Sequence, residues 1–193
     1  MCYNLPMNEI INNIKSRRSV RFYEDKPIAE KDVATIIEAG NAAPSGTNVQ
    51  GWRFVVIQDK VFREKLAAAA LPAYKKWLAT APAPFIEMRK QIDAVSPDPI
   101  YYSAPLIIFV IGTGGTMDMD CPMVCENMML AAHSLGLGSC WVQFGQMALE
   151  NPEIRQALEL KEGEKVYGPI VFGYPRDGFP PPPPKKEPLV KRI

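Results

Sequence analysis

Apolar side chains recur at helical spacing near the start of the chain. Ile10 and Ile14 lie one turn apart in a predicted helix over Asn8 to Lys15. A second helix is predicted over Ala29 to Ala43, where the same spacing repeats from Val33 onward. The chain is therefore expected to form two helices before its first strand.

Short runs rich in β-branched and aromatic residues predict the strands. Leu106 to Ile111 is apolar throughout, which is typical of a strand covered on both faces. Arg53 to Gln58 has the β-branched and aromatic character of a buried strand. Two later runs, Ser139 to Val142 and Lys165 to Phe172, predict the last strands.

Three more helices are predicted around these strands. The first is alanine-rich and contains a possible break at Pro72, and the second follows a loop over Gly112 to Met119. Asn151 is a suitable N-cap for the third, and a proline occupies the first position of that helix. The predicted ranges are Val61 to Thr80, Pro122 to Leu135 and Pro152 to Leu160.

The stretch from Ala81 to Pro99 has several prolines and no clean periodicity. We expect an irregular or short-helical excursion there, and it is a candidate for a mobile lid. Aromatic residues in and around it could stack on an aromatic substrate, although simple packing explains them equally well. These residues are Tyr74, Trp77, Phe85, Tyr101 and Tyr102.

Strands and helices do not alternate regularly, so the order predicts a mixed sheet of α+β or α/β type with helical layers. The length of 193 residues suits a single domain covering 1–193. Residues 176–193 are expected to form an extended arm, in which five consecutive prolines, Pro180 to Pro184, favour polyproline II. A stiff or dimer-wrapping arm is the simplest role, and a ligand for a proline-recognition module is the alternative.

Composition narrows the class of partner. Apolar residues make up 47% and charged residues 22%, so the chain can bury a sizeable core. The net charge of +1 gives no field that favours nucleic acid or an acidic membrane surface. No apolar run approaches the roughly 18 residues of a membrane span, and Met1 to Pro6 lacks the features of a signal peptide. A cytoplasmic protein is expected.

Residues for acid–base or nucleophilic catalysis are scarce. His133 is the single histidine and lies in an apolar helical stretch, where a packing role is usual. Of the four cysteines, Cys2, Cys121, Cys125 and Cys140, only the middle two have a close spacing. That single pair, even with Asp118 and Asp120 nearby, is a weak zinc signal. A chain of this kind either binds a ligand or relies on a reactive cofactor.

Glycine-rich spacing gives no support for a dinucleotide loop. Gly112 to Gly115 follows the long apolar strand, but the spacing differs from Gly-x-Gly-x-x-Gly. Asp118 and Asp120 then stand where a phosphate would need free N–H groups. A plain loop is the simpler interpretation.

One cluster of cations stands out. Arg17, Arg18, Ser19 and Arg21 fall within five residues, and guanidinium groups match phosphate geometry bidentately. The alternative is a solvated basic turn at the end of a helix. From this motif alone the two interpretations are equally good.

A second segment offers neutral polar groups. Residues 43–50 (APSGTNVQ) supply hydroxyl and amide groups without charge just before a predicted strand. Pro44 and Gly46 would let the backbone approach a flat ring, while Ser45, Asn48 and Gln50 could bond its edge. A plain connecting loop is the alternative.

Taken together and in order, these segments resemble the FMN-dependent nitroreductase family. The similarity begins with RRSVRFY at 17–23 and APSGTNVQGWRFVV at 43–56. It continues through Pro105 to Ile108 and the helix, glycine turn and strand at 127–141. It ends with VFGYP at 171–175, so it covers essentially the whole chain.

The resemblance implies where a flavin would lie. Arg17, Arg18, Ser19 and Arg21 match the family's FMN-binding motif, with Arg21 approaching the pyrimidine edge. Pro44, Ser45, Gly46 and Asn48 match a loop that reaches the flavin across the dimer interface, and Gln50 and Trp52 are neighbours of that loop. Trp141, Val142, Gln143 and Phe144 match the segment beside flavin N5. Lys185 and Lys186 occupy the place of the family's C-terminal phosphate ligands, with Lys191 and Arg192 as substitutes.

The resemblance also implies the reaction and the assembly. The expected fold is an α+β three-layer sandwich with a mainly antiparallel sheet, in an intertwined homodimer. The expected activity is reduction of nitroaromatic, quinone or related acceptors, with FMN as cofactor, NADH or NADPH as donor and a ping-pong scheme. Dehalogenation, enone reduction or flavin binding without turnover are the alternatives. Two departures from the family pattern are Gly51, expected to loosen its turn, and the Cys121–Pro122 pair.

Overall fold

The computed structural model describes residues 8–94 and 96–193. The predictions that concern Met1 to Pro6, including Cys2, lie outside these residues. Within the described part, no helix combines the length and apolar character needed to cross a membrane.

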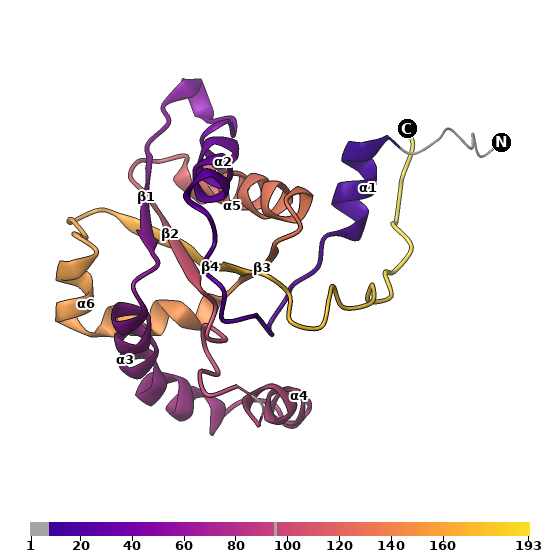
Figure 1. Ribbon diagram of the computed structural model, residues 1–193. Coiled ribbons are helices and arrows are strands. Elements are labelled where there is room, and N and C mark those ends of the chain that lie inside the picture. The colour runs from indigo at the N-terminus through magenta and orange to yellow at the C-terminus, as the bar shows by residue number, and fades with distance from the viewer. Residues whose placement is uncertain (1–7, 95) are drawn as a thin grey trace.

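The centre of the molecule is a four-stranded antiparallel sheet (Figure 1). Its strands, in spatial order, are β1 (Trp52–Ile57), β2 (Leu106–Gly112), β4 (Lys165–Gly173) and β3 (Gly138–Trp141). In addition, Ser19 forms an isolated parallel bridge with Ser139 of β3. The expected sheet is confirmed, and all four predicted strands are present within a residue or two of their predicted bounds.

Helices cover both faces of the sheet, which completes the expected three layers. The helices α2 (Glu30–Asn41) and α5 (Met117–Ser134) pack on one face. The other face carries α3 (Lys60–Leu78) and the 3₁₀ segment η2 (Gln143–Glu150), followed by α6 (Pro152–Ala157). Figure 1 shows the two helical layers on either side of the strands.

Successive side chains of β2 point to opposite faces of the sheet, so they contribute alternately to the core under each helical layer. Ile107, Phe109 and Ile111 contribute to the core under α3. Leu106, Ile108 and Val110 contribute to the core under α2 and α5. All six are at most 1% exposed. This is why β2 is apolar at every position, as its sequence predicts for a strand covered on both faces.

Two prolines were poor guides to helix boundaries. The helix α3 continues through Pro72, so the predicted break is wrong. The helix α5 begins at Met117, five residues before Pro122, so the loop prediction for Gly112 to Met119 is wrong at its C-terminal end. Met117 and Cys121 are buried against the sheet, and this packing offsets the hydrogen bond that Pro122 cannot donate.

The proline-containing excursion folds as a helix. Within Ala81 to Pro99, α4 (Ala83–Asp93) forms three turns, with Pro82 at its N-cap and Pro84 in its first turn, where proline is tolerated. After β4 the chain has no regular secondary structure, and residues 176–193 are exposed; that this segment acts as an extended arm stays a prediction. The short helix α1 (Glu9–Ser16) stands away from the sheet and has no buried residue (Figure 1).

Candidate cofactor site

The arginine run follows α1 and is fixed to the edge of the sheet at β3. The backbone N–H of Val20 donates to the carbonyl of Ser139 over 2.9 Å, beside the bridge that joins Ser19 to the same residue. Gly138 makes this approach possible, because a Cβ there would lie 2.6 Å from the side chain of Val20. The run is therefore held at a defined position and is not a loose basic turn.

The guanidinium groups of Arg17 and Arg18 are half-buried and incompletely bonded. Arg17 Nε lies 3.3 Å from Glu126 Oε1 on α5, an ion pair without hydrogen-bond geometry. Arg18 Nη1 donates to the carbonyls of Lys15 and Arg17, each over 2.7 Å. Its Nε is buried and has no hydrogen-bond partner among the described residues. The cluster thus retains donors directed at no protein acceptor.

Ser19 and Arg21 line a cavity of about 250 Å³ between the run and the start of the C-terminal arm. Arg21 Nη1 donates weakly to the Ser19 carbonyl over 3.3 Å. Ile92 of α4 and Pro180 of the arm contribute apolar contacts to the same cavity. The structure therefore places one face of α4 beside the arginine run.

His133 belongs to the surroundings of this run. Its Nε2 lies 2.7 Å from Ser16 Oγ, and its ring meets Phe179 edge-on at 4.5 Å between centroids. Burial, followed by the charges of Arg17 and Arg18, lowers the pKa of His133. The histidine packs on a helix face, as its sequence context predicted.

The second predicted segment, residues 44–50, is a tight polar loop with an unusual backbone. Thr47, Asn48 and Gln50 have φ values of 51°, 58° and 50°, in the left-handed region. Ser45 Oγ accepts from the Gln50 N–H over 3.1 Å, and Gln50 Nε2 donates to Asn48 Oδ1 over 2.8 Å. Left-handed non-glycine residues are held only where surrounding bonds impose them, and such strain is frequent at functional sites.

Within one chain this loop lies apart from the arginine run. The N–H of Gly46 donates over 3.3 Å to Asp120, in the first turn of α5. Arg17 instead pairs with Glu126, and the charges of Arg17 and Arg18 act on His133, both further along the same helix. These contacts are separated by six and thirteen residues, or about 9 and 20 Å of helix axis. The two groups of predicted residues are therefore not brought together in a single chain.

Residues 141–144 lead from β3 into η2. Trp141 Nε1 donates to Gln143 Oε1 over 3.1 Å, and Val142 is buried. The ring of Phe144 lies 4.7 Å from that of Trp77 and 5.9 Å from that of Phe85. The segment follows directly from the strand that fixes the arginine run, so both lie at one edge of the sheet.

Similarity to known proteins identifies the family. The sequence profile of the Nitroreductase family matches residues 14–174. This chain belongs to the nitroreductase family. An FMN reductase [NAD(P)H] of Bacillus subtilis is 28% identical over 177 residues, which cover 89% of this chain and 68% of the relative.

Solved structures show the same fold within the family. A Bacteroides fragilis nitroreductase with bound FMN is 33% identical, with a TM-score of 0.70 and 96% of each chain covered. A Desulfitobacterium hafniense nitroreductase with bound FMN is 27% identical, with a TM-score of 0.79. That match covers 96% of this chain and 100% of the other.

Two sequence departures from the nitroreductase pattern have a structural explanation. The carbonyl of Gly51 accepts from the Thr113 N–H over 2.9 Å, and a Cβ at Gly51 would lie 2.6 Å from the Thr113 carbonyl, so only glycine fits this close approach; the expected loosening of the turn stays a prediction. The second departure, Cys121, packs in the core against Met117.

Trp52, which follows Gly51 in the sequence, is 9% exposed, and its Nε1 donates to Asn41 Oδ1 over 3.0 Å. It is therefore a core residue.

The aromatic residues proposed for substrate stacking divide into two groups. Tyr74, Tyr101 and Tyr102 are between 1% and 6% exposed, so the packing interpretation is correct for them. Trp77 and Phe85 remain partly exposed and meet edge-on at 4.9 Å, next to Phe144. An aromatic wall of Trp77, Phe85 and Phe144 therefore follows the 141–144 segment.

Lys185 and Lys186 lie in the exposed arm. Neither forms a hydrogen bond or ion pair within the part of the chain that the structure describes.

The three described cysteines are buried free thiols, and burial raises the pKa of each: Cys121, Cys125 and Cys140. Among the described residues no group of three or more histidine, cysteine or acidic side chains could hold a metal ion.

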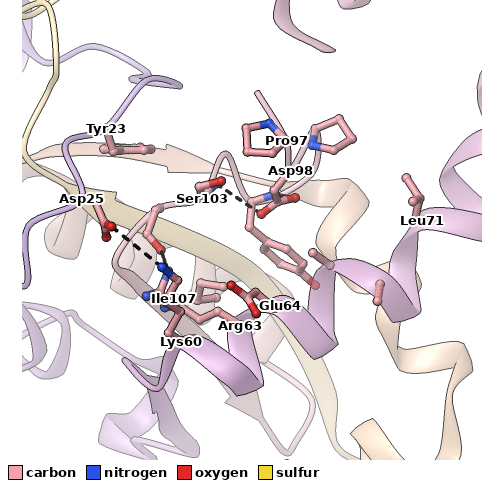
Figure 2. A pocket seen from close by; sticks show the side chains of 15 residues that line it. Tyr23, Asp25, Lys60, Arg63, Glu64, Leu71, Pro97, Asp98, Ser103 and Ile107 are labelled. Atoms are coloured by element: carbon pink, nitrogen blue, oxygen red, sulfur yellow. Dashed lines mark hydrogen bonds and ion pairs between the residues drawn. The ribbon is translucent and has the colours of Figure 1, made fainter. Parts of the chain in front are cut away.

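A larger cavity, of about 540 Å³, lies elsewhere, between α3 and the loop that precedes β2. Figure 2 shows Lys60 of α3 facing Asp25, with 3.9 Å between Nζ and Oδ2, while Asp98 is turned towards Ser103 of its own loop. None of the predicted cofactor residues lines this cavity.

Sequence reasoning missed three residues that adjoin the arginine run: Glu126, Ser139 and Ile92. They come from three distant segments of the chain, so no local motif indicates them.

Proposed function

We propose that this chain is an FMN-dependent NAD(P)H oxidoreductase. The observation that carries the proposal is the arginine run, fixed to β3 with buried guanidinium nitrogens that no protein acceptor satisfies. A buried cation without a full set of acceptors is costly, and a bound anion removes that cost. The FMN in the related nitroreductases supports a flavin phosphate as this anion.

The residues present fit such a cofactor. Arg17, Arg18 and Ser19 would hold the phosphate and ribityl chain, with Lys185 and Lys186 from the arm as further cations. Arg21 would lie at the pyrimidine edge, where a cation stabilises negative charge on a reduced ring. The backbone of Trp141, Val142, Gln143 and Phe144 would line the side of the ring at N5. The chain itself then needs no general base.

When bound, FMN supplies hydride transfer from NADH or NADPH to an acceptor in two separate half-reactions. The protein's contribution is to bind, orient and exclude water. Val142 is buried, and Trp77, Phe85 and Phe144 form an apolar wall beside it. Such a wall suits planar electron-poor acceptors, and nitroaromatic compounds and quinones have that chemistry.

A homodimer completes the proposed site. Pro44, Ser45, Gly46, Asn48 and Gln50 belong to a loop that contacts α5 at Asp120, whereas the arginine run of the same chain pairs with Glu126, further along that helix. In a symmetric dimer, this loop from one subunit can reach the flavin of the other. Exposed apolar residues in the described structure provide a surface for such contact: Ile10 (68%), Ile14 (48%), Met119 (65%) and Met123 (38%).

The substitution Arg17→Ala tests the phosphate role. We expect FMN affinity, measured by quenching of flavin fluorescence, to fall about tenfold to a hundredfold, since one charged hydrogen-bond partner is lost. Lys65→Ala is the matched control, because it removes a paired cation on α3 away from the run. Equal affinity in the Arg17→Ala variant and the control would remove Arg17 from the site.

The dimer has its own test. Light scattering of the FMN-loaded protein is expected to give twice the mass of the chain. Replacing Met119 and Ile14 together with aspartate should shift the mass towards that of one chain and release FMN, because charges would face an apolar surface. A single-chain mass that retains tight FMN binding would contradict the shared site.

A further inference from the structure

Arg89, on α4, is a charged residue at the centre of a buried network. Its side chain is 3% exposed and donates from Nε to Tyr74 over 2.7 Å and from Nη1 to Tyr102 over 3.0 Å. Its Nη2 pairs with Asp93 over 3.0 Å and also donates to the carbonyl of Pro99. One guanidinium group therefore joins α3, α4 and the loop before β2.

That loop is rigidly built to receive Arg89. The Asp98 carboxylate accepts from the backbone N–H groups of Ile100, Tyr101 and Ser103, at 2.9 to 3.2 Å. Figure 2 shows Asp98 turned back onto its own loop, with Ser103 opposite. Tyr102 has a φ of 59°, a left-handed conformation imposed by these bonds. The loop thus presents the Tyr102 hydroxyl at a fixed place.

Attaching a helix through a buried arginine costs free energy, because the charge loses its hydration. Apolar residues of similar volume usually give equal or greater stability than a buried ion pair, because charges lose hydration when they are buried. The planar fork of arginine instead imposes direction, since each N–H must meet its own acceptor. A network of this kind favours one orientation of α4 over others that would bury the same area.

The inner face of α4 spans the proposed site. Phe85, Arg89 and Ile92 lie at i, i+4 and i+7, on one side of the helix. At one end, the Phe85 ring lies 5.9 Å from Phe144, beside the segment predicted to adjoin flavin N5. At the other end, Ile92 lines the cavity that contains Arg21. Arg89 is the anchor between these two ends.

We infer that Arg89 is a positioning residue that fixes α4 as one wall of the acceptor pocket. This inference rests on the proposed function for the location of the acceptor, but not for the orientation of α4. Because its four bonds are made within the protein, Arg89 does not offer its charge to a substrate. The wall it holds is apolar, so it favours a neutral, planar acceptor over an anionic one.

The test compares Arg89→Met with Lys90→Met, a neighbour whose exposed side chain pairs only with Glu87. Hydrogen exchange of the protein without added flavin is the first measurement. In Arg89→Met, we expect amides of α4 to exchange about tenfold faster, with α2 unchanged. In the FMN-loaded protein, the KM for 1,4-naphthoquinone should rise about tenfold, with FMN affinity and kcat within about threefold. Lys90→Met should match the original protein in every measurement.

Tyr102→Phe keeps the proposal testable if Arg89→Met does not fold, because it removes one hydrogen bond and no charge. A smaller effect in the same direction, about threefold on KM and on α4 exchange, is expected. Unchanged α4 exchange and unchanged KM in a folded variant would overturn the positioning role. If the original protein binds no FMN, the proposed function fails, and the exchange measurement still decides whether Arg89 orients α4.

Discussion

His133 shows how the arginine run affects a single neighbouring side chain. Burial and the charges of Arg17 and Arg18 lower the pKa of His133 in the folded protein below its value of 6.5. In the unfolded chain the same group binds its proton at a higher pH. Between these two pKa values, unfolding takes up a proton, so the free energy of unfolding falls as pH falls.

The prediction is a pH-dependent difference between the original protein and His133→Gln. As pH drops from 7.5 through 6.5 to 5.5, the FMN-free original protein should lose more stability in urea than the variant. Above pH 7.5, where His133 is neutral in both states, the difference in stability between the two proteins should no longer change with pH. Identical pH profiles for the two proteins would mean that neither burial nor the arginine charges lower the pKa of His133 in the folded protein.

Residue types in the arginine run predicted a site for an anion, but not which contacts would hold it. The sequence shows Arg17 to Arg21 as neighbours, so their clustering needs no folding to be recognised. Glu126 lies more than a hundred positions along the chain and joins Arg17 only through the packing of α1 and α5. Long-range pairings of this kind have no local pattern, which is why sequence reasoning missed them.

At the scale of elements, β-branched, aromatic and apolar runs located all four strands, and helical spacing placed every predicted helix start within one residue except that of α5. Along β2, every residue is buried because both faces are covered, and the continuous apolar run predicted this directly. Proline was misleading at Pro72 and Pro122, where tertiary packing keeps the helix continuous. The Ala81 to Pro99 stretch lacked periodicity because the inner face of α4 contains Arg89, a polar residue at a buried position.

The contact between the arginine run and β3 provides an element-scale prediction. In Gly138→Ala, the new Cβ would overlap Val20, at 2.6 Å, so the run must move away from the strand. We expect the free energy of unfolding to fall by about 1 to 3 kcal/mol, as in other overpacked sites. FMN affinity should weaken as well, because Ser19 is displaced with Val20.

Gly115→Ala is the control for this substitution, because a Cβ at that position has no neighbour within 4 Å. Urea unfolding and FMN titration of both variants give the comparison. Equal FMN affinity in the two variants, despite a loss of stability in Gly138→Ala, would show that the run's position at β3 does not control cofactor binding.

At the scale of the whole molecule, the three-layer fold and the family follow from the ordered motifs, and the structure and comparisons confirm both. The proposed site extends beyond one chain. The loop at 44–50 and the arginine run occupy different parts of α5, so no pattern in a single sequence shows how they combine. The physical reason is that a shared site depends on an interface between copies.

We propose that this chain binds FMN and passes electrons from a nicotinamide to an acceptor. The most direct measurement is anaerobic addition of NADH or NADPH to FMN-loaded protein, followed by a quinone. The flavin absorbance near 450 nm, a general property of oxidised flavins, is expected to bleach with the donor and return with the quinone, at about one flavin per chain. Protein that takes up no FMN, or bound FMN that neither donor bleaches, would contradict the account.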